Sequence, residues 1–235
     1  MNGISVWRAI ALAVACVALG CGRGERVVRA TSASMEPTLH VGDELVVEGL
    51  DGGPARGDVV LYRVGEGHAT PVPVGPGEYL HRVVGVAGDR VRLVGGRVVL
   101  NGEPAVVVEL DRGECPVRDA GGTVVASSPC SHERETVAGR SRLIQRGPGA
   151  ADPFAVTDWP RERDDMLSTY GAKGKNPAFP DVLVPEGFVV VLGDNRDGAV
   201  DSRFLGPIPV ADVVGRVTRV LSNRDDPARA DLRVE

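Results

Sequence analysis

Two serines separated by one alanine begin the part of the chain that could carry nucleophilic chemistry. Ser32 and Ser34 lie in "RATSASMEPTLHVGDEL", residues 29–45, which has no helical period. Pro37 fixes its own φ and restricts Glu36 to extended backbone, so the segment is held without a helix. The ordinary role of such a hydroxyl is a local turn bond. Because serine is a poor nucleophile until a base removes its proton, Ser34 needs a base elsewhere in the chain.

The chain has four histidines, and one of them is a credible base. His40 follows Ser34 by six residues, whereas His68 and His132 lie in polar stretches that we expect to be loops. His81 lies in "EYLHRVVGV", an apolar stretch typical of a strand, where a lone imidazole is out of pattern. A satisfied core histidine is the usual explanation of such a residue. If Ser34 is activated, His81 is the predicted base.

A third segment, "VLGDNRDGAVDSRFLG" at residues 191–206, concentrates acidic and amide side chains after an apolar strand. An EF-hand calcium loop is excluded, because aligning Gly198 with the glycine of that loop puts Gly193 and Phe204 where carboxylates are required. A polar β-turn is the plain alternative. A carboxylate here could instead orient His81 and stabilise its imidazolium, and no metal or other cofactor is expected.

The elements around these segments are predicted to be β-strands. Short Val-rich runs bounded by Gly and Pro fill residues 43–104 and return at 181–195 and 208–221. They predict a mainly β fold, a coiled antiparallel sheet or partial barrel, with residues 29–100 and 182–222 forming one catalytic domain. Residues 101–181 are expected to form an inserted, loop-rich cap with little sheet of its own, and residues 223–235 a flexible tail.

The N-terminal residues 1–28 form a distinct segment. An uninterrupted apolar stretch runs from Ala9 to Cys21, after Arg8. It could be a tilted membrane anchor, a cleaved signal peptide, or a lipoprotein segment acylated at Cys21. All three place the rest of the chain outside the cytoplasm, although the arginines that follow the stretch weaken that orientation. The net charge of −5 argues against a nucleic-acid partner.

The two remaining cysteines, Cys115 and Cys130, have no His or Cys neighbours at metal-binding spacing. In an exported protein we expect them to form a disulfide, worth about 3 kcal/mol in the chain-entropy model. Two free thiols in a reducing compartment are the alternative.

Four motifs resemble those of type I signal peptidases, membrane-anchored serine proteases that remove signal peptides from exported preproteins. These motifs are "SASMEPTL", "GDVVLY", "YLHRVVGVAGD" and "VLGDNRDGAVDSRFLG", in the order and spacing of that family. The resemblance implies that Ser34 is the nucleophile and that Ser32 helps the Ser34 N–H to hold the oxyanion. It also implies a structural box that contains Asp194, Asp201 and Arg203.

Two positions depart from the bacterial pattern of the family, which places a lysine base where His81 stands and usually a serine where Ala199 stands. A lysine must lose about three pK units, roughly 4 kcal/mol, to be neutral at pH 7, whereas a histidine needs no such shift. A histidine needs a partner on its other nitrogen. The archaeal and endoplasmic-reticulum branch places an aspartate there, which implies Asp201 as the orienting group, with Asp194 or Asp197 as alternatives.

The resemblance therefore implies an endopeptidase at the extracytoplasmic side of the cell membrane, in contact with the lipid surface. Its substrates would be exported preproteins, bound as an added strand and cut after small residues at −1 and −3. For a histidine base, kcat/KM is expected to follow an apparent pKa near 6 to 7.

Three other functions compete with this one. The first is a catalytically silent homologue, or an envelope lipoprotein, that binds signal sequences without cleaving them. The second is a self-cleaving repressor, which would need a helix-turn-helix where the apolar segment stands. The third is a conjugation-pilus maturation protease, which shares the chemistry and differs in substrate.

Overall fold

The computed structural model describes residues 24–65, 75–118, 123–147, 158–160 and 181–235. The strands are β1 (Arg26–Arg29), β2 (Asp43–Glu48), β3 (Val59–Val64), β4 (Gly77–Val86), β5 (Arg90–Val94), β6 (Arg97–Leu100), β7 (Glu103–Pro104), β8 (Val106–Arg118), β9 (Val124–Val137), β10 (Arg140–Arg146), β11 (Val182–Leu183), β12 (Phe188–Leu192), β13 (Ile208–Pro209) and β14 (Val213–Asn223). The helical turns are α2 (Ser202–Leu205), η1 (Val210–Asp212) and η2 (Pro227–Arg229).

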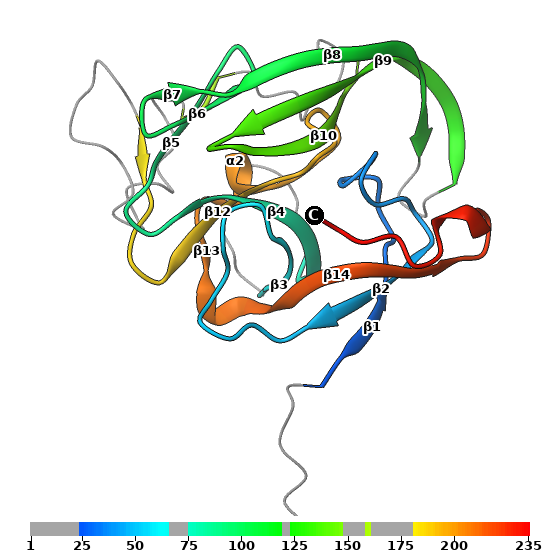
Figure 1. Ribbon diagram of the computed structural model, residues 1–235, viewed down its shortest axis with the longest axis horizontal. Coiled ribbons are helices and arrows are strands. Elements are labelled where there is room, and N and C mark those ends of the chain that lie inside the picture. The colour runs from blue at the N-terminus through cyan, green and yellow to red at the C-terminus, as the bar shows by residue number, and fades with distance from the viewer. Residues whose placement is uncertain (1–23, 66–74, 119–122, 148–157, 161–180) are drawn as a thin grey trace, which may run out of the picture.

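Three antiparallel sheets make up the described fold. A seven-stranded sheet has the order β1-β2-β14-β3-β4-β12-β13, and a four-stranded sheet has the order β11-β5-β6-β7. The long strand β14 pairs with β2 on one side and β3 on the other, with register shifts that bend the sheet. Figure 1 shows β14 crossing beneath the curled β3 and β4. The prediction of a mainly β, antiparallel fold is therefore confirmed.

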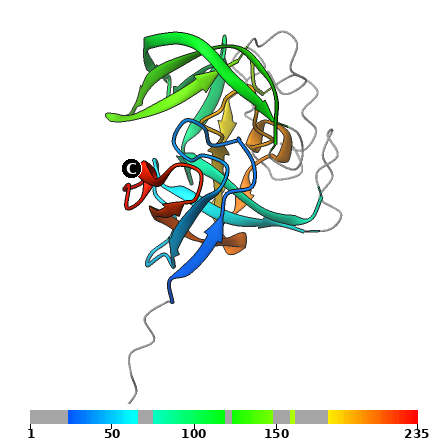
Figure 2. The ribbon, with the colours of Figure 1, turned by 90° about the vertical axis from the view of Figure 1, so that its right-hand side faces the viewer.

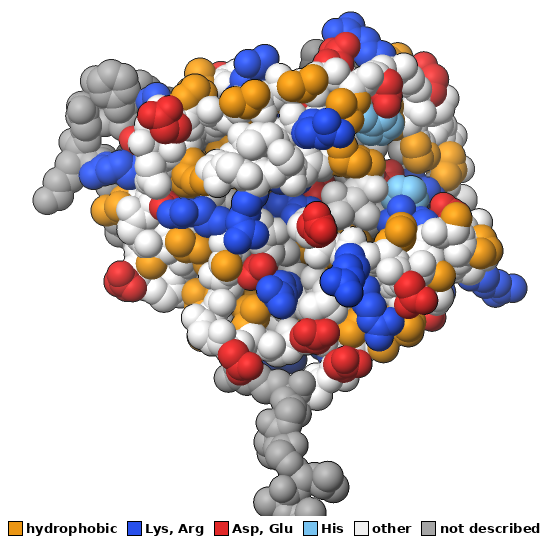
Figure 3. All heavy atoms as spheres, viewed as in Figure 1, with side chains coloured by type: hydrophobic (Ala, Val, Ile, Leu, Met, Phe, Trp, Pro, Cys, Tyr) orange, Lys and Arg blue, Asp and Glu red, His pale blue; other side chains and the backbone are white. Residues whose placement is uncertain are grey.

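The inserted region carries more sheet than the sequence predicted. Strands β8 and β9, of 13 and 14 residues, pair with each other, and β10 adds a third strand. The prediction of a loop-rich cap failed because much of this ribbon is exposed on both faces, so polar and apolar residues do not alternate along it. Val106 and Val125, for example, are 64% and 61% exposed. Figure 3 shows hydrophobic side chains along the edge of the molecule where β8 and β9 lie.

The C-terminal segment also differs from the expected solvated tail. It returns across β14, where the N–H of Val234 donates to the carbonyl of Thr218 at 3.0 Å. Arg229 is buried and donates to both carboxylate oxygens of Asp43, at 2.7 to 3.2 Å. Figure 2 shows this last segment packed against the strands at its side. The buried ion pair fixes a segment whose composition alone is typical of a frayed end.

Residues 1–23 of the predicted N-terminal segment 1–28 lie outside the described residues. Residues 26–28, which we expected in that segment, instead belong to β1 of the seven-stranded sheet. Within the parts of the chain that are described, no helix has the length and apolar character needed to cross a membrane. The helical element α2 has only four residues.

The Asp43–Arg229 pair gives a test of how the C-terminal segment is held. Replacing Arg229 by methionine leaves the fully buried carboxylate of Asp43 without its cation, so the free energy of unfolding should fall by about 3 to 5 kcal/mol. The matched control is Arg219→Met, which breaks an exposed pair with Asp231 and should cost less than about 1 kcal/mol. Equal losses in urea unfolding would show that the buried pair has no special role.

Candidate active site

Residues 30–42 form the loop that carries Ser32 and Ser34, called the serine loop below. Buried apolar side chains anchor it to the core. Met35 and Leu39 are buried in the cluster formed with β2, β3 and β14. The N–H of Leu39 donates to the carbonyl of Met35 at 2.9 Å, so the backbone turns tightly at this point. The Oγ atoms of Ser32 and Ser34 lie 3.2 Å apart, with Ser32 exposed and Ser34 partly exposed. Two hydroxyls are therefore held together at the surface of a loop that is packed on the core.

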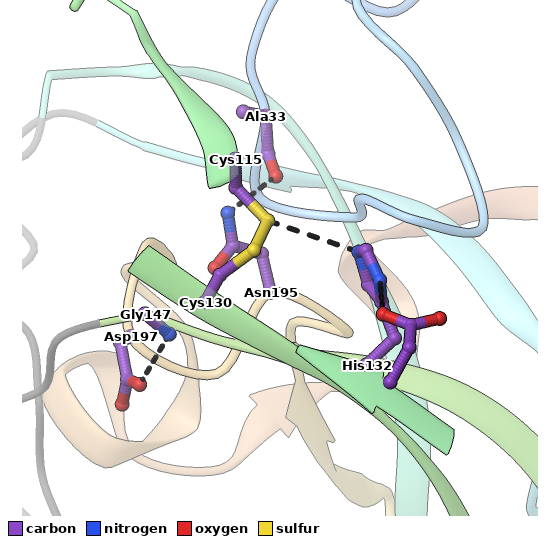
Figure 4. Close-up of a disulfide and its surroundings, with 8 residues drawn as sticks. Ala33, Cys115, Cys130, His132, Gly147, Asn195 and Asp197 are labelled. Atoms are coloured by element: carbon purple, nitrogen blue, oxygen red, sulfur yellow. Dashed lines mark hydrogen bonds and ion pairs between the residues drawn. A yellow bond between two sulfur atoms is a disulfide. The ribbon is translucent and has the colours of Figure 1, made fainter. Parts of the chain in front are cut away.

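Asn195 joins the serine loop to the segment of residues 193–203, called the 193–203 segment below, which lies about 160 positions later in the chain. Its backbone N–H donates to the carbonyl of Ser34 at 3.0 Å, and its Nδ2 donates to the carbonyl of Ala33 at 3.1 Å. Figure 4 shows the side chain of Asn195 directed at Ala33. Sequence reasoning treated Asn195 only as part of a polar turn; the signal that it missed is an amide that can clamp a neighbouring backbone.

Gly193 lets the two segments approach this closely. A Cβ atom at this position would lie 2.6 Å from the carbonyl oxygen of Ser34 and 2.3 Å from the Cβ of Ala199. Both contacts are far inside van der Waals distance, and one involves backbone. A side chain at Gly193 would therefore push the serine loop away from the 193–203 segment.

The carboxylates of residues 194–201 mainly hold the structure. Asp201 is fully buried, accepts from the guanidinium of Arg203 at 2.7 and 2.8 Å, and accepts from the N–H of Gly193 at 2.8 Å. Burial favours a raised pKa for Asp201, but the Arg203 charge and these hydrogen bonds outweigh it and hold the pKa below its usual range. Asp201 therefore stays ionised, and its charge acts on His81.

The two alternative orienting groups have other partners. Asp194 accepts from Arg82 Nη2 at 2.8 Å and from Thr38 Oγ1 at 2.6 Å, which ties β4 to the serine loop. Asp197 accepts from the N–H of Gly147 at 2.9 Å, at the end of β10 (Figure 4).

His81 lies in the middle of β4, opposite Val60 of β3, and is 1% exposed. Its Nδ1 lies 2.8 Å from the hydroxyl of Tyr62. Burial lowers the pKa of His81 to about 4, while Asp201 raises it and Arg203 lowers it to a smaller extent. The imidazole is therefore neutral at pH 7, which is the state that a general base requires.

The structure does not directly join the predicted catalytic groups. Among the described residues, no hydrogen bond links Ser34 to His81 or His81 to Asp201. The Tyr62 hydroxyl is hydrogen-bonded to Nδ1 of His81, the position where we expected the carboxylate of Asp201. The charges of Asp201 and Asp194 act on His81 through space.

A cleft of about 300 Å³ opens beside the serine loop, between β1 and the first residues of β4. Ser32, Ser34, Met35 and Leu80 are among the residues that line it. Successive strand residues point to opposite faces, so His81 points away from Leu80, towards Tyr62. Ser34 therefore lines the cleft, whereas His81 is not among its lining residues.

The remaining predicted pair lies in the cap. Cys115 and Cys130 form a disulfide between β8 and β9, with their Cα atoms 5.7 Å apart (Figure 4). His132, expected in a loop, lies in β9; its Nδ1 is 2.8 Å from a carboxylate oxygen of Asp111. Further along β8, Arg118 Nε donates to Glu36 at 3.3 Å, which connects the cap to the serine loop.

Comparison with known proteins identifies the family. Residues 4–221 match the family described as "Signal peptidase, peptidase S26". The chain belongs to this family. It is 30% identical to a signal peptidase I of Pseudomonas aeruginosa over 86% of its own length and 66% of that protein, and 26% identical to one of Leptolyngbya laminosa over 79% and 63%. A signal peptidase I structure from Enterococcus faecalis matches with a TM-score of 0.30 and 20% identity, over 70% of this chain and 97% of that one.

This member of the signal peptidase family therefore spans about two thirds of the length of the two curated relatives named above. The family match includes the serine loop, β4 and the 193–203 segment, which are the three parts that the structure brings together.

The lowered pKa of His81 predicts how stability depends on pH. Between pH 6.5 and about 4 the unfolded imidazole binds a proton that the folded one does not, so stability falls as the pH falls through this window. Between pH 7 and pH 5 the loss due to His81 should be about 2 kcal/mol. Urea unfolding of the wild type and of His81→Gln should show a pH dependence that is smaller by this amount in the variant. Parallel curves would contradict the lowered pKa.

Proposed function

We propose that the protein is a serine endopeptidase that removes signal peptides from exported preproteins, with Ser34 as nucleophile and His81 as general base. The observation that carries this proposal is the serine loop of a signal peptidase family member, clamped by Asn195 so that the Ser34 hydroxyl lies at an open cleft. In the proposed reaction Ser34 Oγ attacks the scissile carbonyl and its proton passes to His81, which then delivers it to the leaving amine.

The surroundings of His81 favour it as the base. Only two of the 27 basic residues are lysines, Lys173 and Lys175, and both lie outside the described residues. His81 is a neutral imidazole close enough to Asp201 for that carboxylate to favour the protonated form. We assign Asp201 the electrostatic part of the role that a triad aspartate plays, and Ser32 the support of the oxyanion.

The substrate is proposed to bind as a strand between β1 and β4. β1 is an edge strand of the seven-stranded sheet. The first residues of β4, Gly77 to Leu80, pair with β3 on one side, whereas β12 pairs only with Arg82 to Val86. Both strands therefore offer unpaired backbone to an extended peptide. We place the catalytic domain at the extracytoplasmic membrane surface, anchored by the apolar stretch that precedes β1.

Cleavage of a preprotein tests the proposal. Purified protein should release the signal peptide of a model preprotein with alanine at −1 and −3, and Ser34→Ala should lower kcat/KM at least a thousandfold because the nucleophile is lost. His81→Ala should lower it by a similar factor. His81→Lys should restore little, since Ala199 provides no hydroxyl to seat an amine. The control is Ser222→Ala, which removes an exposed hydroxyl bonded to Glu44.

The pH profile tests the base separately. With a His81 pKa near 4, kcat/KM should stay level from pH 7 down to about 5 and then fall. This fall occurs at a lower pH than it would with a histidine whose pKa is unshifted. An acid limb centred above pH 8.5 would rule out the histidine, because that range belongs to an amine base.

One observation favours a second function, a silent homologue that binds signal sequences. In the described structure Ser34 makes no hydrogen bond with His81, and His81 is absent from the lining of the cleft. Such a protein would bind the model preprotein without cleaving it, and Ser34→Ala would not change the bound fraction.

A further inference from the structure

Among the described residues, the Tyr62 side chain is the one that forms a hydrogen bond with the proposed base. Its hydroxyl lies 2.8 Å from His81 Nδ1, and both side chains are at least 99% buried. The register explains the contact: Tyr62 lies opposite Tyr79 and Val60 opposite His81, so Tyr62 and His81 are diagonal neighbours on one face of adjacent strands. The centroids of the Tyr62 and His81 rings are 5.9 Å apart.

The groups that could otherwise orient the imidazole are engaged elsewhere or lack polar atoms. The two carboxylate oxygens of Asp201 accept from Arg203 and the N–H of Gly193, and those of Asp194 accept from Arg82 and Thr38. Ala199 has no hydroxyl. With Nδ1 engaged by Tyr62, only Nε2 can take the proton of the nucleophile.

We propose that Tyr62 is a positioning residue for His81, its hydroxyl oxygen accepting the Nδ1–H of the reactive tautomer and of the imidazolium. This inference rests on the proposed function. It gives Tyr62 the orienting part of the role that we expected of Asp201, and leaves Asp201 the charge.

The Tyr62–His81 hydrogen bond has two possible directions, and only one of them leaves His81 able to act as a base. If the phenol donates to Nδ1, the neutral imidazole carries its hydrogen on Nε2 and has no lone pair there to act as a base. If Nδ1–H donates to the phenol oxygen, the lone pair is on Nε2. When Ser34 gives up its proton, Nε2 becomes N–H and the imidazolium donates from both nitrogens, so the Tyr62 oxygen must accept. Each step conserves one transferred proton, and no other reactant is needed.

Tyr62→Phe tests the proposal, because it keeps the ring and removes only the oxygen. We expect kcat/KM to fall at least tenfold, with KM within twofold of wild type. The acid limb of kcat/KM should move to lower pH, because the cation loses an acceptor. A limb that moves to higher pH would show that the phenol donates to the neutral imidazole, and would overturn the proposal.

Two further variants distinguish a role of Tyr62 in positioning His81 from a general loss of stability. In His81→Ala, the residual rate should change less than twofold when Tyr62→Phe is added, because there is no imidazole to orient. Thr218→Val, which removes a hydroxyl bonded to Glu48 at 3.0 Å in β14, is the matched control and should keep the wild-type rate. A tenfold loss that persists without His81 would overturn the proposal.

A spectroscopic measurement needs no activity. Nitrogen-15 spectra of histidine-labelled protein at pH 7 should show His81 with its hydrogen on Nδ1 in the wild type, and a mixture of tautomers in Tyr62→Phe. A hydrogen on Nε2 in both would contradict the inference. If Ser34→Ala and His81→Ala abolish cleavage while Tyr62→Phe leaves it unchanged, the proposed function stands and the role of Tyr62 falls.

Discussion

The backbone contact between the serine loop and the 193–203 segment is the constraint on which the site depends. Asn195 donates to two successive carbonyls of the loop, and Gly193 passes close to the second of them. These contacts join residues about 160 positions apart in the chain. Because the 193–203 segment is itself fixed by Asp201 and the turn α2, its contacts with the main chain of the serine loop help to set the position of Ser34, together with the buried side chains of that loop.

Buried carboxylates paired with arginine fix the surrounding body. Asp43, Asp194, Glu135 and Asp201 are each at most 1% exposed, and each is bonded to at least one guanidinium. The pairs connect distant parts: Asp194 joins the serine loop to β4, and Glu135 joins the cap strand β9 to Arg196. Arginine suits this use because its planar fork satisfies both oxygens of a carboxylate and stays charged when buried.

Much of the fold was predictable from local pattern. Val-rich runs between Gly and Pro gave most strands of the main sheet, and the order of motifs indicated which segments meet. The cap was not predictable, because the β8–β9 ribbon is exposed on both faces and lacks the alternation by which strands are recognised. The C-terminal segment was also missed, since partners far away in the sequence hold it: Asp43 binds Arg229, and β14 pairs with its backbone.

The site was predictable in its residue types and less so in its contacts. Ser34 and His81 stand out, the first by its bend and the second as a lone imidazole in an apolar strand. The partner of His81 was not apparent, because Tyr62 reads as an ordinary strand aromatic. Its contact with His81 depends on the pairing register of β3 and β4, which sequence periodicity does not fix.

The contact between Tyr62 and His81 has an evolutionary consequence. Both side chains are buried, and the Tyr62 hydroxyl lies 2.8 Å from Nδ1 of the imidazole. If another residue replaced His81, the Tyr62 hydroxyl would lose this partner inside the core, and a buried polar group without a partner destabilises the fold. Positions 62 and 81 are therefore expected to be inherited together.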